Sequence, residues 1–231
     1  QITLTPRNTD TKGVTLASEG ANGALYIIDG ETQIAINDSW IESSSNWGDG
    51  SHSSTAIAVS DKNNNGTADN TADDYYQVAV KMLNTWTDFN TGQKNTNEDW
   101  QIYSIYASGS NQGNNNWDKT VWTQSIQSYE ETFGQDLDGD NSIGLNLSNL
   151  TTASGDTTGW LLKKDSKKSL YITDSDGDNP ITIKDEYGGT PNFDYSSSWG
   201  SGSRSSEAIA AEINADNTFS IAIKHTHSFG S

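Results

Sequence analysis

The chain has 231 residues, of which 32% are hydrophobic and 10% aromatic, and its 31 acidic residues against 13 Lys and Arg give a formal net charge of −18 at pH 7. This charge excludes nucleic acid and anionic membrane surfaces as expected partners, because both need basic patches on the protein. There is no cysteine, so we expect neither disulfides nor thiolate-bound metals. No apolar run reaches the roughly 20 residues of a membrane helix, and we expect no membrane insertion.

The sequence contains an internal repeat. Three blocks in the first half recur in the same order in the second half: 24–38 with 169–185, 43–59 with 196–211, and 75–81 with 218–224. Self-similarity of this kind indicates a repeated structural module. We expect residues 1–145 to form an essentially complete copy, of which 1–14 can be the tail of a preceding copy. Residues 146–231 then form a second, truncated copy.

The repeated blocks predict β-strands. Apolar and polar residues alternate in "LYIID" (25–29), "QIAIN" (33–37), "TAIAV" (55–59), "YQVAV" (76–80) and "WQIYSIY" (100–106). Such alternation is typical of strands that bury one face, whereas the Asn-, Asp- and Gly-rich stretches 61–74 and 107–116 predict loops. We expect a mainly β fold with antiparallel sheets packed as a sandwich or as barrel-like repeat modules.

One segment, "TQSIQSYEETFGQ", has helical spacing instead. Ile126, Tyr129 and Phe133 recur at the interval of one helix face, with Thr123 as the expected N-cap and Gly134 as the expected stop. The segment therefore predicts one short amphipathic helix that precedes an acidic loop of the calcium type.

The helix and its surroundings resemble a known family. Trp100 and Tyr103 form a Trp-x-x-Tyr strand, and the helix leads into "FGQDLDGDNSIG" (133–144). Together they resemble the tryptophan-rich repeat domain of large secreted proteins of cyanobacteria and other aquatic bacteria, whose hallmark is that strand, a helix and the ending "fgqDlNgDGtiG". The resemblance implies an extracellular or cell-surface module without established catalytic activity. Asp138 and Asn141 depart from the family pattern, but Asn tolerates the left-handed backbone for which Gly is used, so we expect the loop to form.

The strongest chemical signal is the run of Asp136, Asp138 and Asp140. Alternate carboxylates in a turning loop can converge on one Ca²⁺, a hard cation that takes oxygen ligands. Ser142 occupies the position where a backbone carbonyl normally completes such a loop. The run therefore predicts a calcium site, and a solvated acidic turn is the alternative interpretation.

The loop lacks the acid that an EF-hand carries at its twelfth position, because that position is Leu147. We expect the missing ligand to come from Glu130 or Glu131 of the preceding helix, or from a neighbouring copy of the module.

Two further acidic runs are candidate calcium sites. The second run has four acids: Asp174, Asp176, Asp178 and Asp185. The strand-like "ITI" within it favours a hairpin tip as the simpler interpretation. The third run starts at Asp61 and Asn63 and continues to Asp74, and a plain polar turn is its alternative interpretation.

The tryptophans predict either core or ligand contacts. Trp47 and Trp199 each precede a Gly-x-Gly, and Trp100 begins a strand, so we expect these three in the core. The candidates for exposed rings on which a sugar can stack lie in or near polar loops: Trp86, Trp117 and Trp122.

Catalytic residues are not indicated. The sequence has no Cys and no Gly-x-Ser-x-Gly elbow, and His52 lies in a Ser-rich loop without a distinguishable Asp partner. His225 and His227 share one side of a predicted strand but lack an evident third metal ligand. We therefore expect no enzyme activity.

These patterns together predict a non-catalytic, extracellular, calcium-binding and adhesive module. Its expected partners are a polysaccharide or cell-surface glycan, neighbouring repeats, or a second copy that pairs through an exposed strand edge. The first alternative is a carbohydrate-binding module attached to a secreted enzyme. The second is a hydrolase domain, whose carboxylates cannot be singled out among the 31 acids.

Overall fold

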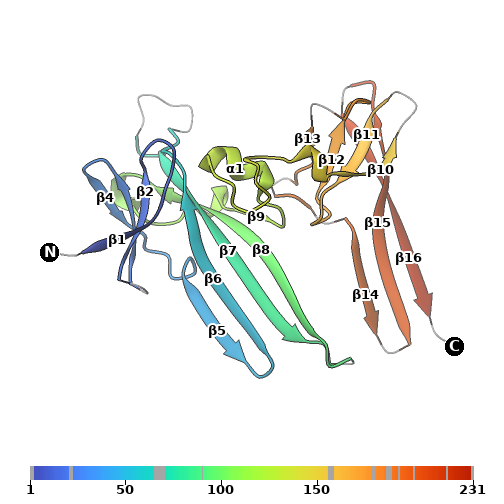
Figure 1. Ribbon diagram of the computed structural model, residues 1–231, viewed down its shortest axis with the longest axis horizontal. Coiled ribbons are helices and arrows are strands. Elements are labelled where there is room, and N and C mark those ends of the chain that lie inside the picture. The colour runs from blue at the N-terminus through green and yellow to red at the C-terminus, as the bar shows by residue number, and fades with distance from the viewer. Residues whose placement is uncertain are drawn as a thin grey trace. The chain divides into compact units, whose positions relative to one another are not determined.

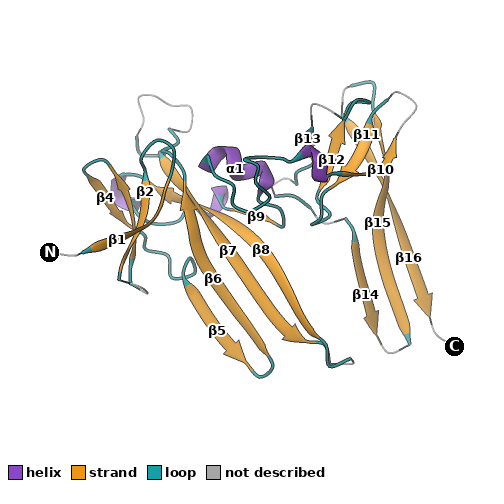
Figure 2. Cartoon of the chain, viewed as in Figure 1, coloured by secondary structure: helices purple, strands orange, loops and turns teal. Residues whose placement is uncertain are grey.

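The computed structural model describes residues 3–20, 23–64, 71–89, 91–155, 159–177, 180–185, 189–191, 193–199, 201–216 and 218–229. In these residues the chain is mainly β, with antiparallel sheets and one α-helix, which confirms the predicted fold class (Figure 2). No described sheet closes into a barrel. The chain divides into two compact units, 1–144 and 145–231.

Two sheets build the first unit, and the strands of each pair in chain order. The small sheet consists of β1 (Leu4–Thr9), β2 (Thr15–Glu19), β3 (Leu25–Asp29) and β4 (Thr32–Ala35). The large sheet consists of β5 (Ser43–Trp47), β6 (Gly50–Val59), β7 (Tyr75–Thr87), β8 (Lys94–Tyr106) and β9 (Val121–Thr123). Figure 1 shows β5 to β8 continuing past the small sheet. We call this extension the arm: residues 43–54, 82–89 and 91–99.

Alternation along β8 sends side chains to the two faces of the large sheet. Tyr103 and Ile105 face the small sheet and join the main core of the unit. Trp100 and Ile102 face the other way and pack with Phe133 of the helix. Because a strand points successive side chains to opposite faces, the large sheet buries both of its faces near the middle.

The helix α1 (Gln127–Phe133) begins later in the chain than the expected N-cap at Thr123 indicates. Gly134 ends it with a left-handed φ of 63°, as predicted. Thr123 is not the N-cap, because it pairs with Trp100 at the edge of the sheet; Ile126 takes the cap position. A helix of seven residues is too short to be stable by itself, so packing against the sheet must hold it. No helix in the described part of the chain is long and apolar enough to span a membrane.

The prediction that Trp47 and Trp199 lie in the core is wrong. Their side chains are 50% and 45% exposed, whereas Trp100 is 1% exposed, as predicted. Each exposed ring lies over the glycine that closes its hairpin: an added Cβ would lie 2.6 Å from Trp47 Nε1 at Gly50, and 2.8 Å from Trp199 Nε1 at Gly202. The Trp-Gly-x-Gly pattern therefore marks a hairpin tip at which a ring covers bare backbone.

The second unit has two sheets with the same order of pairing. One consists of β10 (Thr151–Gly155), β11 (Leu161–Lys164), β12 (Leu170–Thr173) and β13 (Ile181–Thr182). The other consists of β14 (Tyr195–Trp199), β15 (Gly202–Ile213) and β16 (Phe219–Phe229). Their core includes Leu162, Leu170 and Ile172, with the ring of Trp160 edge-on to Phe219 at a centroid distance of 5.3 Å.

Three short 3₁₀ helices complete the described elements: η1 (Gly109–Asn111), η2 (Trp117–Lys119) and η3 (Leu147–Asn149).

The two units share local irregularities as well as strand order. A β-bulge follows Ala56 in β6, and another follows Ala208 in β15. In the first unit Glu42 Oε1 accepts a hydrogen bond from the backbone N–H of Ala56 at 2.9 Å. In the second unit Asp194 Oδ1 accepts one from the backbone N–H of Ala208 at 2.8 Å. In both units a carboxylate therefore secures the backbone just before the bulge.

Candidate functional site

The acidic loop (residues 136–144) follows directly after α1 and is built from left-handed turns. Gly139, Asn141 and Gly144 have positive φ angles of 81°, 69° and 84°. The chain turns around Asp136, whose two carboxylate oxygens accept hydrogen bonds from the backbone N–H groups of Gly139 at 2.7 Å and Asn141 at 2.8 Å. Asn141 adopts the left-handed conformation for which many such loops use Gly.

Glu130 is the buried centre of this region. Its side chain extends from α1 and is 0% exposed. Oε1 accepts hydrogen bonds from the backbone N–H groups of Leu137 at 2.7 Å and Asp138 at 3.0 Å, and Oε2 accepts one from Gly144 at 3.0 Å. Burial raises the pKa of the Glu130 carboxyl group, and these backbone hydrogen bonds oppose that shift. The carboxylate therefore ties the helix to both ends of the acidic loop.

Glu130, Asp136 and Asp138 form a carboxylate cluster that could hold a metal ion. One oxygen from each side chain lies within 4.8 Å of the others. Glu131, the other glutamate expected to contribute, is exposed and outside the cluster. The Glu131 side chain lies instead over the end of the loop, where a Cβ added at Gly144 would be 3.0 Å from Glu131 Cγ.

Asp140 and Ser142 lie beside the carboxylate cluster and are not part of it. Asp140 Oδ1 accepts a hydrogen bond from the backbone N–H of Ser142 at 2.9 Å. Gln127 Nε2 donates to Asp138 Oδ2 at 2.8 Å and to Asp140 Oδ2 at 3.2 Å. The Gln127 amide is 6% exposed, and its Oε1 has no hydrogen-bond partner in the described residues. This amide offsets part of the repulsion between the two carboxylates.

The second acidic run forms turns. Strands β12 and β13 pair antiparallel, as the hairpin interpretation predicts, and a backbone hydrogen bond of 3.0 Å to the carbonyl of Asp174 closes the first turn. Asp185 Oδ1 accepts a backbone N–H at 2.9 Å. Asp178 lies outside the described residues. In the described part of this run, Asp174, Asp176 and Asp185 form no cluster of three acids.

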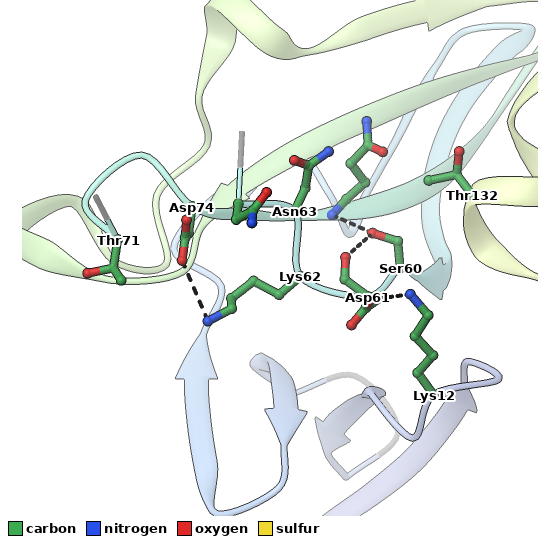
Figure 3. A pocket seen from close by; sticks show the side chains of 10 residues that line it. Lys12, Ser60, Asp61, Lys62, Asn63, Thr71, Asp74 and Thr132 are labelled. Carbon is green, nitrogen blue, oxygen red and sulfur yellow. Dashed lines mark hydrogen bonds and ion pairs between the residues drawn. The ribbon is translucent and has the colours of Figure 1, made fainter. Parts of the chain in front are cut away.

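The third acidic run lines a pocket of about 590 Å³. Lysines pair with its carboxylates, as Figure 3 shows: Lys12 Nζ lies 2.5 Å from Asp61 Oδ2, and Lys62 Nζ lies 3.5 Å from Asp74 Oδ2. The remainder of the run, 65–70, lies outside the described residues. Because side-chain ammonium groups already offset these charges, the described residues favour the polar-turn interpretation over a metal site.

An aromatic groove opens on the face of the large sheet opposite α1. It has a volume of about 250 Å³ and is lined by Trp40, His52, Met82, Gln101, Tyr103, Trp117 and Trp122. Trp117 and Trp122, two of the three tryptophans expected to be exposed, are 59% and 58% exposed. The third, Trp86, is 43% exposed but lies on the arm, outside the groove.

Sheet pairing and one anchored loop fix the walls of the aromatic groove. Trp122 on β9 lies opposite Gln101 on β8. A backbone hydrogen bond of 2.7 Å to the carbonyl of Ser104 holds η2, and with it Trp117, against β8. The Trp117 ring meets Tyr103 edge-on, at a centroid distance of 5.9 Å and an interplanar angle of 63°. The Trp117 and Trp122 backbones are therefore fixed while their rings face solvent.

Sequence reasoning did not assign five of the lining residues to a ligand site: Trp40, His52, Met82, Gln101 and Tyr103. Trp40 is 64% exposed, and its carbonyl accepts a hydrogen bond from Ser54 Oγ at 2.6 Å. Gln101 is 1% exposed, and its Nε2 has no partner in the described residues. Its place between Trp100 and Ile102 identifies its face of the strand, but nothing local in the sequence shows which loop covers that face.

The histidines do not form a metal site. His225 and His227 are both exposed on β16, and the His227 ring stacks on Phe229 at a centroid distance of 6.5 Å. His52 Nδ1 lies 2.8 Å from Asn84 Oδ1. The one cluster of potential metal ligands found in the described residues contains no histidine.

Comparison of the chain with protein-family models, curated proteins and solved structures finds no match.

Proposed function

We propose that the protein is a non-catalytic, extracellular adhesive module whose acidic loop binds Ca²⁺. The observation that carries this proposal is the carboxylate cluster of Glu130, Asp136 and Asp138. Its place after a helix, in a chain with a Trp-x-x-Tyr strand, supports relation to the tryptophan-rich repeat domain that the sequence resembles.

The chemistry of the carboxylate cluster favours Ca²⁺. Calcium takes six to eight oxygen ligands in flexible geometry, whereas Mg²⁺ demands a near-ideal octahedron. Three carboxylates of unequal burial and a curved backbone suit the more tolerant ion. The Gln127 amide oxygen, buried and without a partner in the described residues, is a further neutral ligand if the amide turns.

The aromatic groove supports a binding role without catalysis. A glycosidase needs two carboxyl groups on either side of the bond that it cleaves, and the residues that line the groove include no Asp or Glu. The carboxylate cluster lies on the opposite side of the large sheet, the side on which α1 packs. The carboxylate cluster and the aromatic groove therefore lie on opposite faces of the large sheet. This separation suits an ion with a structural role and a groove with a binding role.

We also propose that the two units are copies of one module. Each has a sheet of four strands paired in chain order, followed by a sheet that begins with a Trp-Gly-x-Gly hairpin. The bulges after Ala56 and Ala208, and the carboxylates bonded to those residues, support the same correspondence. A repeated module suits a spacer or adhesive protein, in which each copy adds surface.

Calcium is expected to raise the melting temperature of the protein. A ligand present at about 100 times its Kd stabilises the folded state by about 2.7 kcal/mol, which corresponds to a shift of roughly 5–10 °C for a domain of this size. Melting should be followed in millimolar Ca²⁺ and in EDTA. Asp136→Asn should abolish the shift, and Asp49→Asn, which changes an exposed acid in the β5–β6 turn, should keep it. Equal melting temperatures with and without Ca²⁺ would remove the metal from the proposal.

The free edge of β16 is expected to cause self-association. In the described residues β16 pairs only with β15, and an unpaired strand edge is a template for another chain. We expect the mass in solution, measured by light scattering, to rise from monomer toward dimer with concentration. Ala222→Lys on the exposed part of β16 should suppress this rise, whereas Thr55→Lys on the inner strand β6 should not. A constant monomer mass would contradict the expectation.

A further inference from the structure

The aromatic groove exposes more ring surface than its surroundings require. Trp40, Trp117 and Trp122 are each more than half exposed, although the backbone of each is secured by the sheet or by hydrogen bonds. Contiguous exposed apolar surface on a soluble protein marks an interaction site more often than chance. Rings on a fixed backbone also lose little freedom when a ligand binds, which favours affinity.

Gln101 shows that the aromatic groove is incomplete by itself. This amide lies in the wall of the groove, 1% exposed, and its Nε2 has no hydrogen-bond partner in the described residues. A buried donor without an acceptor is unfavourable, because it has lost its water without replacement. A ligand with a hydroxyl oxygen at this point would supply the missing acceptor.

The charge around the aromatic groove determines the sign of its ligand. Its lining contains no carboxylate, and its only histidine, His52, is hydrogen-bonded to Asn84. The chain as a whole carries a formal net charge of −18, which disfavours the approach of anions. An anionic ligand has no partner in the lining. A cation could lie over the aromatic rings, but it would bring no acceptor to the Gln101 Nε2 donor. A neutral ligand with hydroxyl groups therefore fits best.

Size and chemistry narrow the ligand further. The groove, at about 250 Å³, is smaller than the roughly 300–1,000 Å³ of sites for drug-sized molecules, which suits one small ring at a time. A pyranose ring with equatorial substituents presents an apolar C–H face to an aromatic ring and hydroxyl groups at its edge. Those two features match exposed tryptophans beside an amide donor.

We propose that the aromatic groove binds one pyranose residue of a neutral polysaccharide whose rings carry equatorial substituents, with the sugar face stacked on Trp117 or Trp122 and a hydroxyl accepting from Gln101 Nε2. This inference extends the proposed adhesive function by naming its ligand. It uses none of the residues of the carboxylate cluster, so loss of calcium binding would leave it standing.

The arm extends the binding surface beyond the aromatic groove. Met82 of the groove and Trp86 lie four residues apart on β7, so both point to the same face of the sheet. At about 3.4 Å per residue they are separated by roughly 14 Å along the strand. A chain of several sugar residues can therefore reach Trp86, whereas a disaccharide in the groove cannot. We expect cellohexaose to bind more tightly than cellobiose, and Trp86→Ala to reduce only the longer ligand's advantage.

Calorimetric titration of the full chain with cellohexaose tests the proposal. Trp117→Ala and Trp122→Ala remove exposed rings and should weaken binding at least about tenfold each while leaving the melting temperature nearly unchanged. Trp199→Ala, which removes a similarly exposed ring from the second unit, is the matched control and should bind like the wild type. Polygalacturonate oligomers, which are anionic, should not bind.

Gln101→Leu gives the most specific readout. The substitution keeps the approximate shape of the side chain and removes the buried donor, so the melting temperature should stay the same or rise while affinity for cellohexaose falls about tenfold. A structural role for Gln101 predicts the opposite, a lower melting temperature. The titrations should be repeated in EDTA. If cellohexaose still binds and Ca²⁺ does not change the melting temperature, the proposed metal site is refuted and the proposed sugar site is not. No binding of cellohexaose, or binding unaffected by both Trp substitutions, would overturn the proposal.

Discussion

Replacement of Glu130 by Ala is expected to lower the free energy of unfolding of the first unit by about 3 kcal/mol or more. The buried carboxylate accepts three backbone hydrogen bonds, from Leu137, Asp138 and Gly144, and Ala would leave these donors without a partner. Of the side-chain hydrogen bonds described above between α1 and the loop, only those from Gln127 to Asp138 and Asp140 would then remain. Urea unfolding followed by tryptophan fluorescence would measure the effect.

Glu131→Ala is the control for this experiment, because the neighbouring glutamate is exposed and outside the carboxylate cluster. It should change the free energy of unfolding by less than about 0.5 kcal/mol. Glu130→Gln should lie between the two, since its amide oxygen can still accept from Leu137 and Asp138 while its NH₂ group cannot accept from Gly144. Equal stability of the Glu130→Ala and Glu131→Ala variants would show that Glu130 does not support the loop.

The same carboxyl group should make stability depend on pH in calcium-free buffer. Burial raises the pKa of Glu130 above its ordinary value of 4.5, so the folded state holds this proton more tightly than the unfolded state. The contribution of Glu130 to stability is therefore greatest below that value and decreases as the pH rises through the raised pKa. The wild type should lose stability relative to Glu130→Gln over this interval, measured as urea midpoints at a series of pH values. Urea midpoints of the wild type and of Glu130→Gln that change equally with pH would contradict the expected shift in pKa.

Replacement of Trp100 by Ala is expected to cost about 4 kcal/mol, within the range for large-to-small substitutions of buried aromatic residues. Trp100 is 1% exposed and belongs to the core that joins the large sheet to Ile126, Tyr129 and Phe133 of the helix region. Lys81 Nζ also lies over its ring, 5.6 Å from the centroid. The helix α1 has too few turns to persist without this core.

The Trp100→Ala variant should therefore also bind Ca²⁺ more weakly, since α1 supplies Glu130 to the carboxylate cluster. Chemical denaturation and calcium titration of the same variant would measure both effects. Trp122→Ala is the control, because its ring is 58% exposed and contributes little to the core. A Trp100→Ala variant with unchanged stability would contradict the assignment of Trp100 to the core between the large sheet and α1.

The strands and the helical face follow from periodicity, which is a local property of the sequence. Alternation predicts β3, β6, β7 and β8, and the spacing of Ile126, Tyr129 and Phe133 predicts the buried face of α1. The start of the helix does not follow from this spacing, since Thr123 suits an N-cap equally well by composition. Its pairing with Trp100 in β9 decides the outcome, and that contact depends on residues distant in the chain.

The sites could be predicted only in part, for similar reasons. The acidic loop is local, so its left-handed turns lie within reach of sequence reasoning. The choice between Glu130 and Glu131 stayed open in the sequence, and the structure places Glu130 in the carboxylate cluster. The aromatic groove depends on the register between β8 and β9 and on the loop that carries Trp117, so Gln101 and Trp40 have no local signal. The prediction that Trp47 and Trp199 lie in the core was wrong because each faces a glycine across its hairpin. The glycine has no side chain, so the ring can cover the backbone there and stay exposed.

A crystal structure of the protein grown in millimolar Ca²⁺ tests the central claim most directly. The account predicts an ion bound by oxygens of Asp136, Asp138 and Glu130 at about 2.3–2.6 Å, with an anomalous signal appropriate to calcium. Carboxylates that keep only their hydrogen bonds to backbone N–H groups, with no ion between them at that calcium concentration, would contradict it.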